Sequence, residues 1–346
     1  MSNTRENMKS LTSFSFTYIY ICIVSLFISF SAISADTEQA KLLLERLSQS
    51  LRQVNFNTSF VVVKNNQAEP YHWLHGIVEN KVEEGEEAKE PVELEILALL
   101  NGPRRDILRI NNQVSYIEPE YAPYSIESEY ISGPIPIALS QDISTLEKYY
   151  HFVLVGKNRI LGRAAQLIRI VPKDAHRFGY WLWLDQESGL LLKLAVITQK
   201  GNLLEQIQFT HLDITDTISE NLSQLQATEL PSIVEVAAQQ KAVNLAWKVN
   251  WLPDGFVPVT SDRHRINASK QTVEFMLFND GLVDISVYVN PSKEANRAIE
   301  FANDGATLVL NQVIHNVEVS VVGKIPLETA KKIVASVSFN PVSTNP

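Results

Sequence analysis

The chain has 346 residues, of which 45% are apolar and 20% are charged, and its formal net charge is −9. A chain of this length is typical of two domains, and the composition is that of a globular protein rather than a disordered one. The acidic balance argues against a general nucleic-acid-binding protein, which needs a basic stripe. We therefore expect no nucleic-acid partner.

Residues 1–35 are predicted to be a secretory signal peptide. Arg5 and Lys9 precede an apolar run over Thr17–Phe30, and small residues at 31–35 lead into a polar segment. This order of charged, apolar and small residues is typical of a cleaved signal. An uncleaved anchor helix is the alternative, although the run is short for a membrane span. We expect export, with cleavage after Ser34 or Ala35.

The single cysteine, Cys22, lies within that apolar run. The processed chain would then contain no cysteine. This predicts a protein without disulfides, without a thiolate nucleophile and without a cysteine metal site.

An N-terminal domain is predicted over residues 36–215. Glu38–Val54 carries apolar residues at helical spacing, and Phe56–Lys64 and Glu69–Val78 are typical of strands. Residues 79–95 hold eight Glu and two Lys, which favours a solvated loop over a site for a cation or a basic partner. A proline-rich passage from 119 to 144 follows further short strands, and a loop this long within a domain is usually functional.

The rest of this domain is predicted to be an antiparallel meander. Four strand-length runs are separated by short turn sequences, and such connections join only antiparallel neighbours. The runs are Gln166–Val171, Phe178–Asp185, Leu190–Thr198 and Leu203–Thr210.

Two runs of the meander are apolar on both faces, which an antiparallel sheet with one solvated face would not be. A sheet covered by helices on both sides and a curved sheet around an apolar cavity both remain open. For the cavity, the candidate ligand-binding residues are Tyr180, Trp181, Trp183 and Leu192.

A linker is predicted over residues 216–240 and a smaller C-terminal domain over 241–346. Asp280-Gly281, between two strand-like runs, is the clearest hairpin signal in the chain. Glu294–Phe301 is predicted as a short helix and Asp262–Arg265 as a polar loop. Pro326–Ser336 is predicted as the terminal helix, because proline is well tolerated at a helix start.

Catalytic motifs are not found in the sequence, and the seven histidines form no metal-binding pattern. We expect no enzyme activity, no cofactor and no metal. Arg104 and Arg105 are candidates for binding a phosphate or carboxylate, with solvated arginines as the alternative. With catalytic and metal sites excluded, we expect a binding protein that takes up an apolar ligand or a segment of a partner protein.

The chain resembles the RseB/MucB family along nearly all of its processed length. The matching segments occur in the same order in both domains: Asn101–Arg105, Tyr116–Pro119, Val155–Ile160, Tyr180–Asp185, Trp251–Phe256 and Pro326–Val337. The resemblance implies an α+β protein, in which a LolA/LppX-like curved antiparallel half-barrel with helices is followed by a smaller C-terminal α/β domain.

The resemblance also implies a function. The family consists of periplasmic regulators that bind the periplasmic part of a transmembrane anti-sigma factor and shield it from proteolysis. Lipopolysaccharide or lipoprotein acyl chains would release the regulator, and homo-oligomers are among the partners to consider. A periplasmic lipid or lipoprotein carrier is the alternative, which the first domain alone would suggest.

Overall fold

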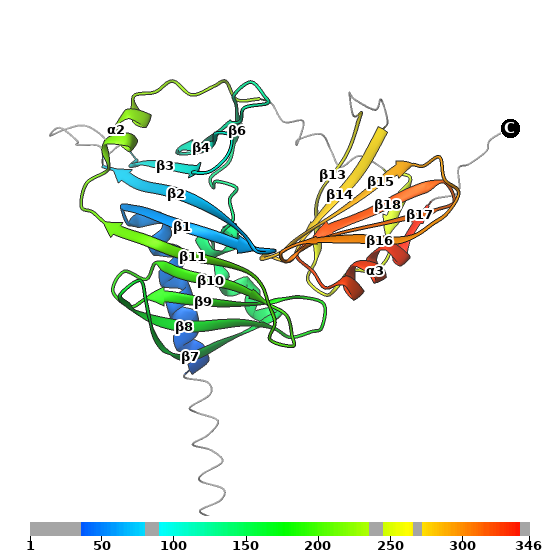
Figure 1. Ribbon diagram of the computed structural model, residues 1–346, viewed down its shortest axis with the longest axis horizontal. Coiled ribbons are helices and arrows are strands. Elements are labelled where there is room, and N and C mark those ends of the chain that lie inside the picture. Colours follow the sequence, from blue (N-terminus) through cyan, green and yellow to red (C-terminus); the bar gives the residue numbers. More distant parts are fainter. Residues whose placement is uncertain (1–35, 80–89, 235–244, 266–271, 340–346) are drawn as a thin grey trace, which may run out of the picture.

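The computed structural model describes residues 36–79, 90–234, 245–265 and 272–339. The predicted signal peptide, part of the acidic segment and part of the predicted linker lie outside these residues. Within the described residues, no helix is both long and apolar enough to cross a membrane. Figure 1 shows two β-sheets side by side, a large curved one and a smaller one.

The large sheet has eleven strands in the order β6-β5-β4-β3-β2-β1-β11-β10-β9-β8-β7. Every neighbouring pair is antiparallel, and β8 to β11 form the predicted meander, to which β7 adds a further strand. The curved half-barrel is therefore confirmed. Its strands are β1 Phe56–Lys64, β2 Gln67–Val78, β3 Val92–Leu99, β4 Arg105–Ile110, β5 Gln113–Ile117, β6 Tyr124–Glu127, β7 Tyr150–Ile160, β8 Arg163–Pro172, β9 Gly179–Asp185, β10 Leu191–Ile197 and β11 Leu203–Ile214.

The inner face of this sheet is covered by helical segments. The N-terminal helix, residues 36–53, and two short 3₁₀ helices, η1 (Ile137–Ser140) and η2 (Ile143–Lys148), pack there. The predicted helix is confirmed, but its buried stripe differs from the predicted one, since Leu42 is 56% exposed. The residues that it does bury lie three or four positions apart and share one face. The buried residues of that stripe are Ala40, Leu44, Leu47 and Leu51.

Among the described residues, one helix covers the outer face, and it does so at one end of the sheet. Helix α2 (Glu220–Gln226) packs through Leu222 and Leu225 onto Leu74 and Leu94, which belong to β2 and β3. The Ser219 side chain accepts a hydrogen bond from the Leu222 amide and so caps this helix. Part of the predicted linker therefore belongs to the N-terminal sheet, and the domain limits at 215 and 241 stay predictions.

The smaller sheet has six strands in the order β13-β14-β15-β18-β17-β16, all antiparallel. Helix α3 (Leu327–Ser336) covers one face, as predicted, with Pro326 at its start. The strands are β13 Val257–Arg265, β14 Thr272–Asn279, β15 Asp284–Pro291, β16 Arg297–Asp304, β17 Thr307–Ile314 and β18 Val317–Gly323, with a separate pair of β12 Trp247–Val249 and β19 Val337–Phe339.

Two local predictions for this domain are wrong. Glu294–Phe301 was expected to be a helix, but strand β16 begins at Arg297; Asp262–Arg265 was expected to be a loop, but it ends strand β13. Both strands lie at edges of the sheet. An edge strand is solvated on one side and carries charged residues, so its polar sequence resembles a loop or an exposed helix.

The two domains meet around a buried arginine. Arg177, in the loop before β9, is 0% exposed, and its Nε donates to Asp280 Oδ2 at 2.6 Å. The guanidinium also pairs with Asp174 and donates to the Asp254 carbonyl. Tyr150 Oη donates to the same Asp280 oxygen at 2.8 Å. Asp280 lies in the predicted hairpin of the C-terminal domain, so this network joins the domains.

Candidate functional site

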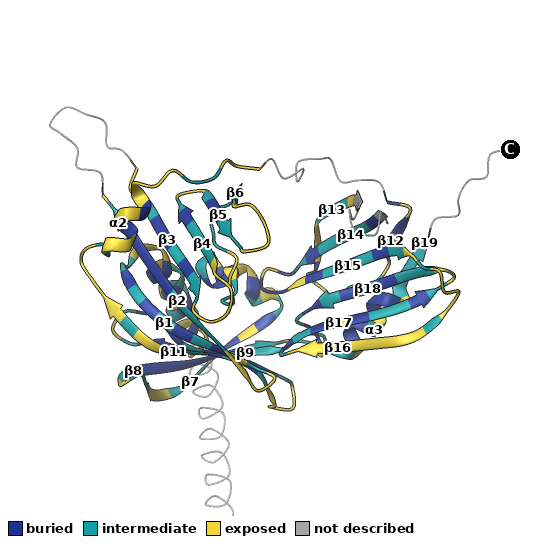
Figure 2. Cartoon of the chain, turned by 45° about the horizontal axis from the view of Figure 1, so that its top comes forward, coloured by how far each residue is buried: buried dark blue, intermediate teal, exposed yellow. Residues whose placement is uncertain are grey.

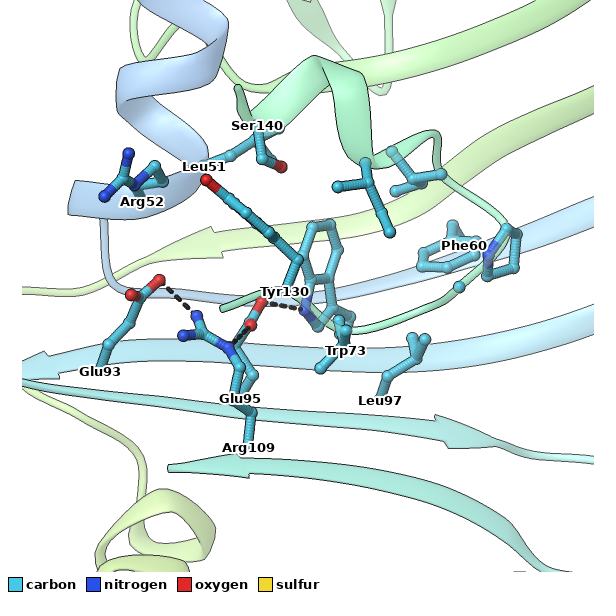
Figure 3. A pocket seen from close by; sticks show the side chains of 15 residues that line it. Leu51, Arg52, Phe60, Trp73, Glu93, Glu95, Leu97, Arg109, Tyr130 and Ser140 are labelled. Carbon is cyan, nitrogen blue, oxygen red and sulfur yellow. Dashed lines mark hydrogen bonds and ion pairs between the residues drawn. The ribbon is translucent and has the colours of Figure 1, made fainter. Parts of the chain in front are cut away.

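The inner face of the large sheet is hollow beneath the proline-rich passage. One hollow has a cavity volume of about 40 Å³, and Trp73, Leu97 and Phe60 form its apolar wall. The segment from Tyr130 to Ile137 covers it (Figure 3). A side chain at Gly133 would place its Cβ 2.8 Å from Leu97 Cδ2, so the cover approaches β3 closely. The predicted functional loop therefore borders a cavity.

A charged cluster forms one side of this hollow. Arg109 on β4 is 3% exposed and forms ion pairs with Glu93 and Glu95 on β3 (Figure 3). Trp73 Nε1 donates to Glu95 Oε1 at 3.1 Å, so the indole orients the second carboxylate. His75 Nε2 lies 3.2 Å from Glu93 Oε1. The other ring nitrogen, Nδ1, lies 2.7 Å from the Val54 carbonyl oxygen, so the imidazole bridges the cluster and the chain after the N-terminal helix.

The same contacts control the ionisation of Glu93. Burial raises the pKa of this carboxyl, but hydrogen bonds from His75 and Arg109, together with the charge of Arg109, outweigh burial and lower the pKa to about 2. Glu93 is therefore a carboxylate at any pH at which the protein is expected to work, and the wall of the hollow keeps its charge.

This cluster corrects the prediction for residues 79–95. Residues 79–95 were assigned to a solvated acidic loop, with a strand predicted from Leu94 to Leu100, but the strand, β3, begins at Val92 and includes both Glu93 and Glu95. Residues 80–89 lie outside the described part of the chain. The signal was the alternation of Val92, Leu94 and Ile96 with glutamates, which is typical of a strand; the high local charge hid it.

Two further hollows continue from the first, and Gly133 and Pro134 line all three. The second hollow is bordered by Tyr71 and Arg105 of the N-terminal domain and by Lys324 of the C-terminal domain. The third is a cleft with about 1410 Å³ of empty space, open solvent included. One chain segment, the proline-rich passage, thus separates the cavity in the half-barrel from the cleft between the domains.

The C-terminal side of the cleft is the face of the small sheet that α3 does not cover. Val259, Ser286 and Val322 belong to strands of this sheet and line the cleft. Val259 is 57% exposed. Phe275 and Tyr288 stack on neighbouring strands, with ring centroids 5.8 Å apart. Such an open, partly apolar face next to a cleft is suited to an extended partner segment.

The structure does not bring the four candidate ligand-binding residues together. Tyr180 and Trp181 are consecutive in β9, so their side chains point to opposite faces. Tyr180 is buried in the core and borders the cleft, whereas Trp181 and Trp183 are on the outer face. Leu192 is buried at an irregularity where β10 pairs with β9. Ligand binding by this set stays a prediction.

The two candidate arginines also separate. Arg104 is exposed, and its Nε donates to Asp106 Oδ2 at 2.6 Å. Arg105 lines the second hollow beside Tyr71 and Tyr116. Only Arg105 is therefore placed to meet an anionic group in a cavity. The residues of the first hollow that the sequence did not indicate are Trp73, Glu93, Glu95 and Arg109, which become neighbours only when β2, β3 and β4 pair.

A curved half-barrel with a covered cavity, joined through a cleft to a second sheet, defines a two-domain binding protein. The sequence profile of the MucB/RseB N-terminal domain matches residues 39–234, and that of the MucB/RseB C-terminal domain matches residues 241–338. The chain belongs to the MucB/RseB family.

Individual relatives agree with this assignment. The Sigma-E factor regulatory protein RseB of Salmonella typhimurium is 30% identical over 92% of this chain and 96% of its own length. The Escherichia coli protein of the same name is 29% identical over 90% and 94%. The solved complex of Pseudomonas aeruginosa MucA and MucB superposes with a TM-score of 0.67 at 28% identity, covering 87% of this chain and 99% of that one.

Proposed function

We propose that this chain is a periplasmic regulator that binds the periplasmic segment of a transmembrane anti-sigma factor and shields that segment from proteolysis. The observation that carries the proposal is the cleft between the domains, lined by the proline-rich passage and by the open face of the small sheet. The solved complexes of MucB with MucA, one of them described as MucA(peri), support it.

The cleft suits an extended segment better than a compact small molecule. It is lined by backbone and small side chains of two β-strands, β15 and β18, and by the prolines of the covering passage. Both strands already pair with a neighbour on each side, so an extended segment would bind this face through burial of its side chains. A segment held there is hidden from a protease, so protection rises with occupancy and needs no catalysis by this chain.

The experiment is cleavage of the anti-sigma factor's periplasmic segment by its protease, with and without this protein. Cleavage should slow in proportion to the complex formed. Val259→Asp and Val322→Asp should weaken binding about tenfold or more, because each introduces a charge into an apolar contact. The matched control is Leu42→Asp, since Leu42 is 56% exposed on the N-terminal helix, away from the cleft. Unchanged cleavage at saturating protein would overturn the regulatory proposal.

A lipid ligand is the second part of the proposal. The hollow lined by Trp73, Leu97 and Phe60 could hold part of an acyl chain, and each buried methylene contributes about 0.8 kcal/mol. Arg105 in the neighbouring hollow is placed for a phosphate or carboxylate head group. Binding of such a ligand to the free protein would weaken partner binding by the same linkage factor.

Lipid A or a fatty acid should therefore change the fluorescence of Trp73, and Trp73→Phe should remove most of that response. Lipopolysaccharide should restore cleavage of the protected segment. A ligand response without any protection would favour the alternative, a periplasmic lipid or lipoprotein carrier.

Self-association of the chain is also part of the proposal, and analytical ultracentrifugation with and without lipid measures it.

A further inference from the structure

The outer face of the half-barrel at strands β7 to β10 carries aromatic and cationic side chains. Helix α2 covers the outer face only near β2 to β4, at the other end of the sheet (Figure 1). We call this set of side chains the Trp181 face. It is made up of the exposed Val153 and Val155 and the half-buried Arg169, Trp181, Trp183 and Lys193. On β9 burial alternates residue by residue, so that Trp181 and Trp183 are left for the outer face, whereas Figure 2 shows β8 as mostly buried.

The strand register arranges the Trp181 face as two cation–aromatic pairs. Arg169 lies directly opposite Trp181, and its guanidinium is 5.2 Å from the centre of that ring. Lys193 lies directly opposite Trp183, with its Nζ 4.9 Å from the ring centre. The two indole rings are 6.2 Å apart. The four side chains therefore form one continuous cluster across β8, β9 and β10.

Both cations of this cluster lack a carboxylate partner within the part of the chain that the structure describes. Arg169 Nε is buried and has no hydrogen-bond partner there. The pKa of Lys193 is lowered by burial, with no acidic neighbour to oppose it. The nearby carboxylates Asp185 and Glu187 both pair with Arg163. Both cations are therefore available to an external anionic group.

Two exposed apolar residues extend the same face to the free edge of the sheet. Val153 and Val155 on β7 are 39% and 50% exposed. Beyond them the register shifts, so that Lys157 and Arg159 pair with Gln166 and Ala164 and belong to the other face of the sheet. None of the hollows described above includes the Trp181 face. The surface is therefore broad and open, and it is not shaped to enclose a small molecule or to clamp a peptide.

We propose that the Trp181 face docks on the surface of an anionic phospholipid bilayer. Indole rings prefer the boundary between head groups and acyl chains, and long cationic side chains reach from there to the phosphates. Arg169 and Lys193 supply the charge, and the exposed valines enter the boundary beside the rings. This contact lies on the opposite side of the sheet from the cavity, so it is independent of ligand binding there.

The test is co-sedimentation of the exported protein, purified from periplasm, with vesicles. Vesicles of phosphatidylethanolamine and phosphatidylglycerol should bind the protein, and vesicles of phosphatidylcholine should bind it about tenfold less. The bound fraction should fall as salt is added, because screening weakens contacts between exposed charges. Equal binding to both vesicle types, or none to either, would overturn the proposal.

The double variant Arg169→Gln/Lys193→Gln should bind the anionic vesicles about tenfold less than the wild type, since each cation near an anionic surface contributes measurably. The matched control Lys200→Gln/Lys248→Gln removes two exposed charges elsewhere and should bind like the wild type. Equal melting temperatures would show that both variants fold.

A second readout follows the aromatic residues. Brominated acyl chains should quench the fluorescence of the wild type, and Trp181→Phe/Trp183→Phe should lose most of this quenching. Quenching that survives in this variant would place the contact elsewhere and overturn the proposal. Binding of an acidic peptide, poly-glutamate, with no binding of anionic vesicles would assign the face to a protein partner instead.

Discussion

Two buried arginines show how the same ion-pair chemistry serves different ends in this protein. Arg177 and Arg109 are 0% and 3% exposed, and each pairs with two carboxylates. Around Arg177, aromatic rings complete the packing, and the guanidinium lies 4.9 Å from the Phe256 ring centre. Around Arg109, one side of the cluster borders a hollow.

The two networks differ in which parts of the chain carry the arginine and its carboxylate partners. The Arg177 network joins the loop before β9 to the hairpin at Asp280, so it holds two domains in one orientation. The Arg109 network lies within one sheet, on the neighbouring strands β3 and β4, and orients Trp73 toward the cavity. A buried ion pair between domains therefore specifies their arrangement, whereas one within a sheet shapes a cavity wall.

The largest effect is expected from breaking the Arg177 network. Arg177→Met leaves Asp280 buried without its partner, which should lower the free energy of unfolding by about 3–5 kcal/mol. Urea unfolding measures this, and small-angle scattering should show that the domains have changed their arrangement.

The control is Arg177→Met/Asp280→Asn. It removes the uncompensated charge but keeps an oxygen for the backbone amides of Leu282 and Val283. This variant should recover a large part of the lost stability. A loss below about 1 kcal/mol for the single variant would show that the network does not hold the domains together.

The Arg109 network should give an acid-dependent loss of stability. Because the pKa of Glu93 falls from 4.5 to about 2 on folding, its ionisation stabilises the folded state at any pH above the unfolded value. As pH decreases from about 4.5 to about 2, about 3 kcal/mol should be lost from this group.

Unfolding free energies measured across that pH range test this value. In Glu93→Gln the unfolding free energy should decrease less steeply as the pH falls through this range. Glu69→Gln, which replaces a glutamate of β2, should show the same decrease as the wild type. If the unfolding free energy of Glu93→Gln decreased with pH as steeply as that of the wild type, Glu93 would not be the source of the acid-dependent loss.

The smallest effect is expected at a second contact between the domains. Lys64 Nζ lies 2.6 Å from Asp304 Oδ2, but the Asp304 side chain is 60% exposed. An exposed pair contributes about 1 kcal/mol or less, because water and salt screen it. Asp304→Asn should therefore change the unfolding free energy by less than about 1 kcal/mol and leave the scattering profile unchanged. If Asp304→Asn lowered the unfolding free energy as much as Arg177→Met does, the Lys64–Asp304 pair would stabilise the protein as much as the buried pair, contrary to this prediction.

Most strands could be predicted from the sequence because their signals are local. The turn residues between β8 and β11 and the Asp280-Gly281 hairpin each act over a few neighbours, and all of these predictions are confirmed. Pro326 at the start of α3 is equally local. Failures occurred where charge masked alternation, as in Glu93 and Glu95 on β3 and in edge strand β16.

The candidate site could not be predicted in the same way. A strand such as β9, apolar on both faces, shows that both faces are covered or used, but it does not show which face is concave. Sheet curvature, the N-terminal helix and α2 decide that, and they place Tyr180 inside and Trp181 outside.

The sequence by itself determined the two-domain organisation, the antiparallel meander and the family, because local turn chemistry and the order of motifs suffice for these. Only the tertiary structure decided which charges meet. Arg177 and Asp280 are 103 positions apart, and Arg109 and Glu95 lie on separate strands. Each ion pair forms only after strands or domains have packed and removed water from the two groups, a condition that no local pattern records.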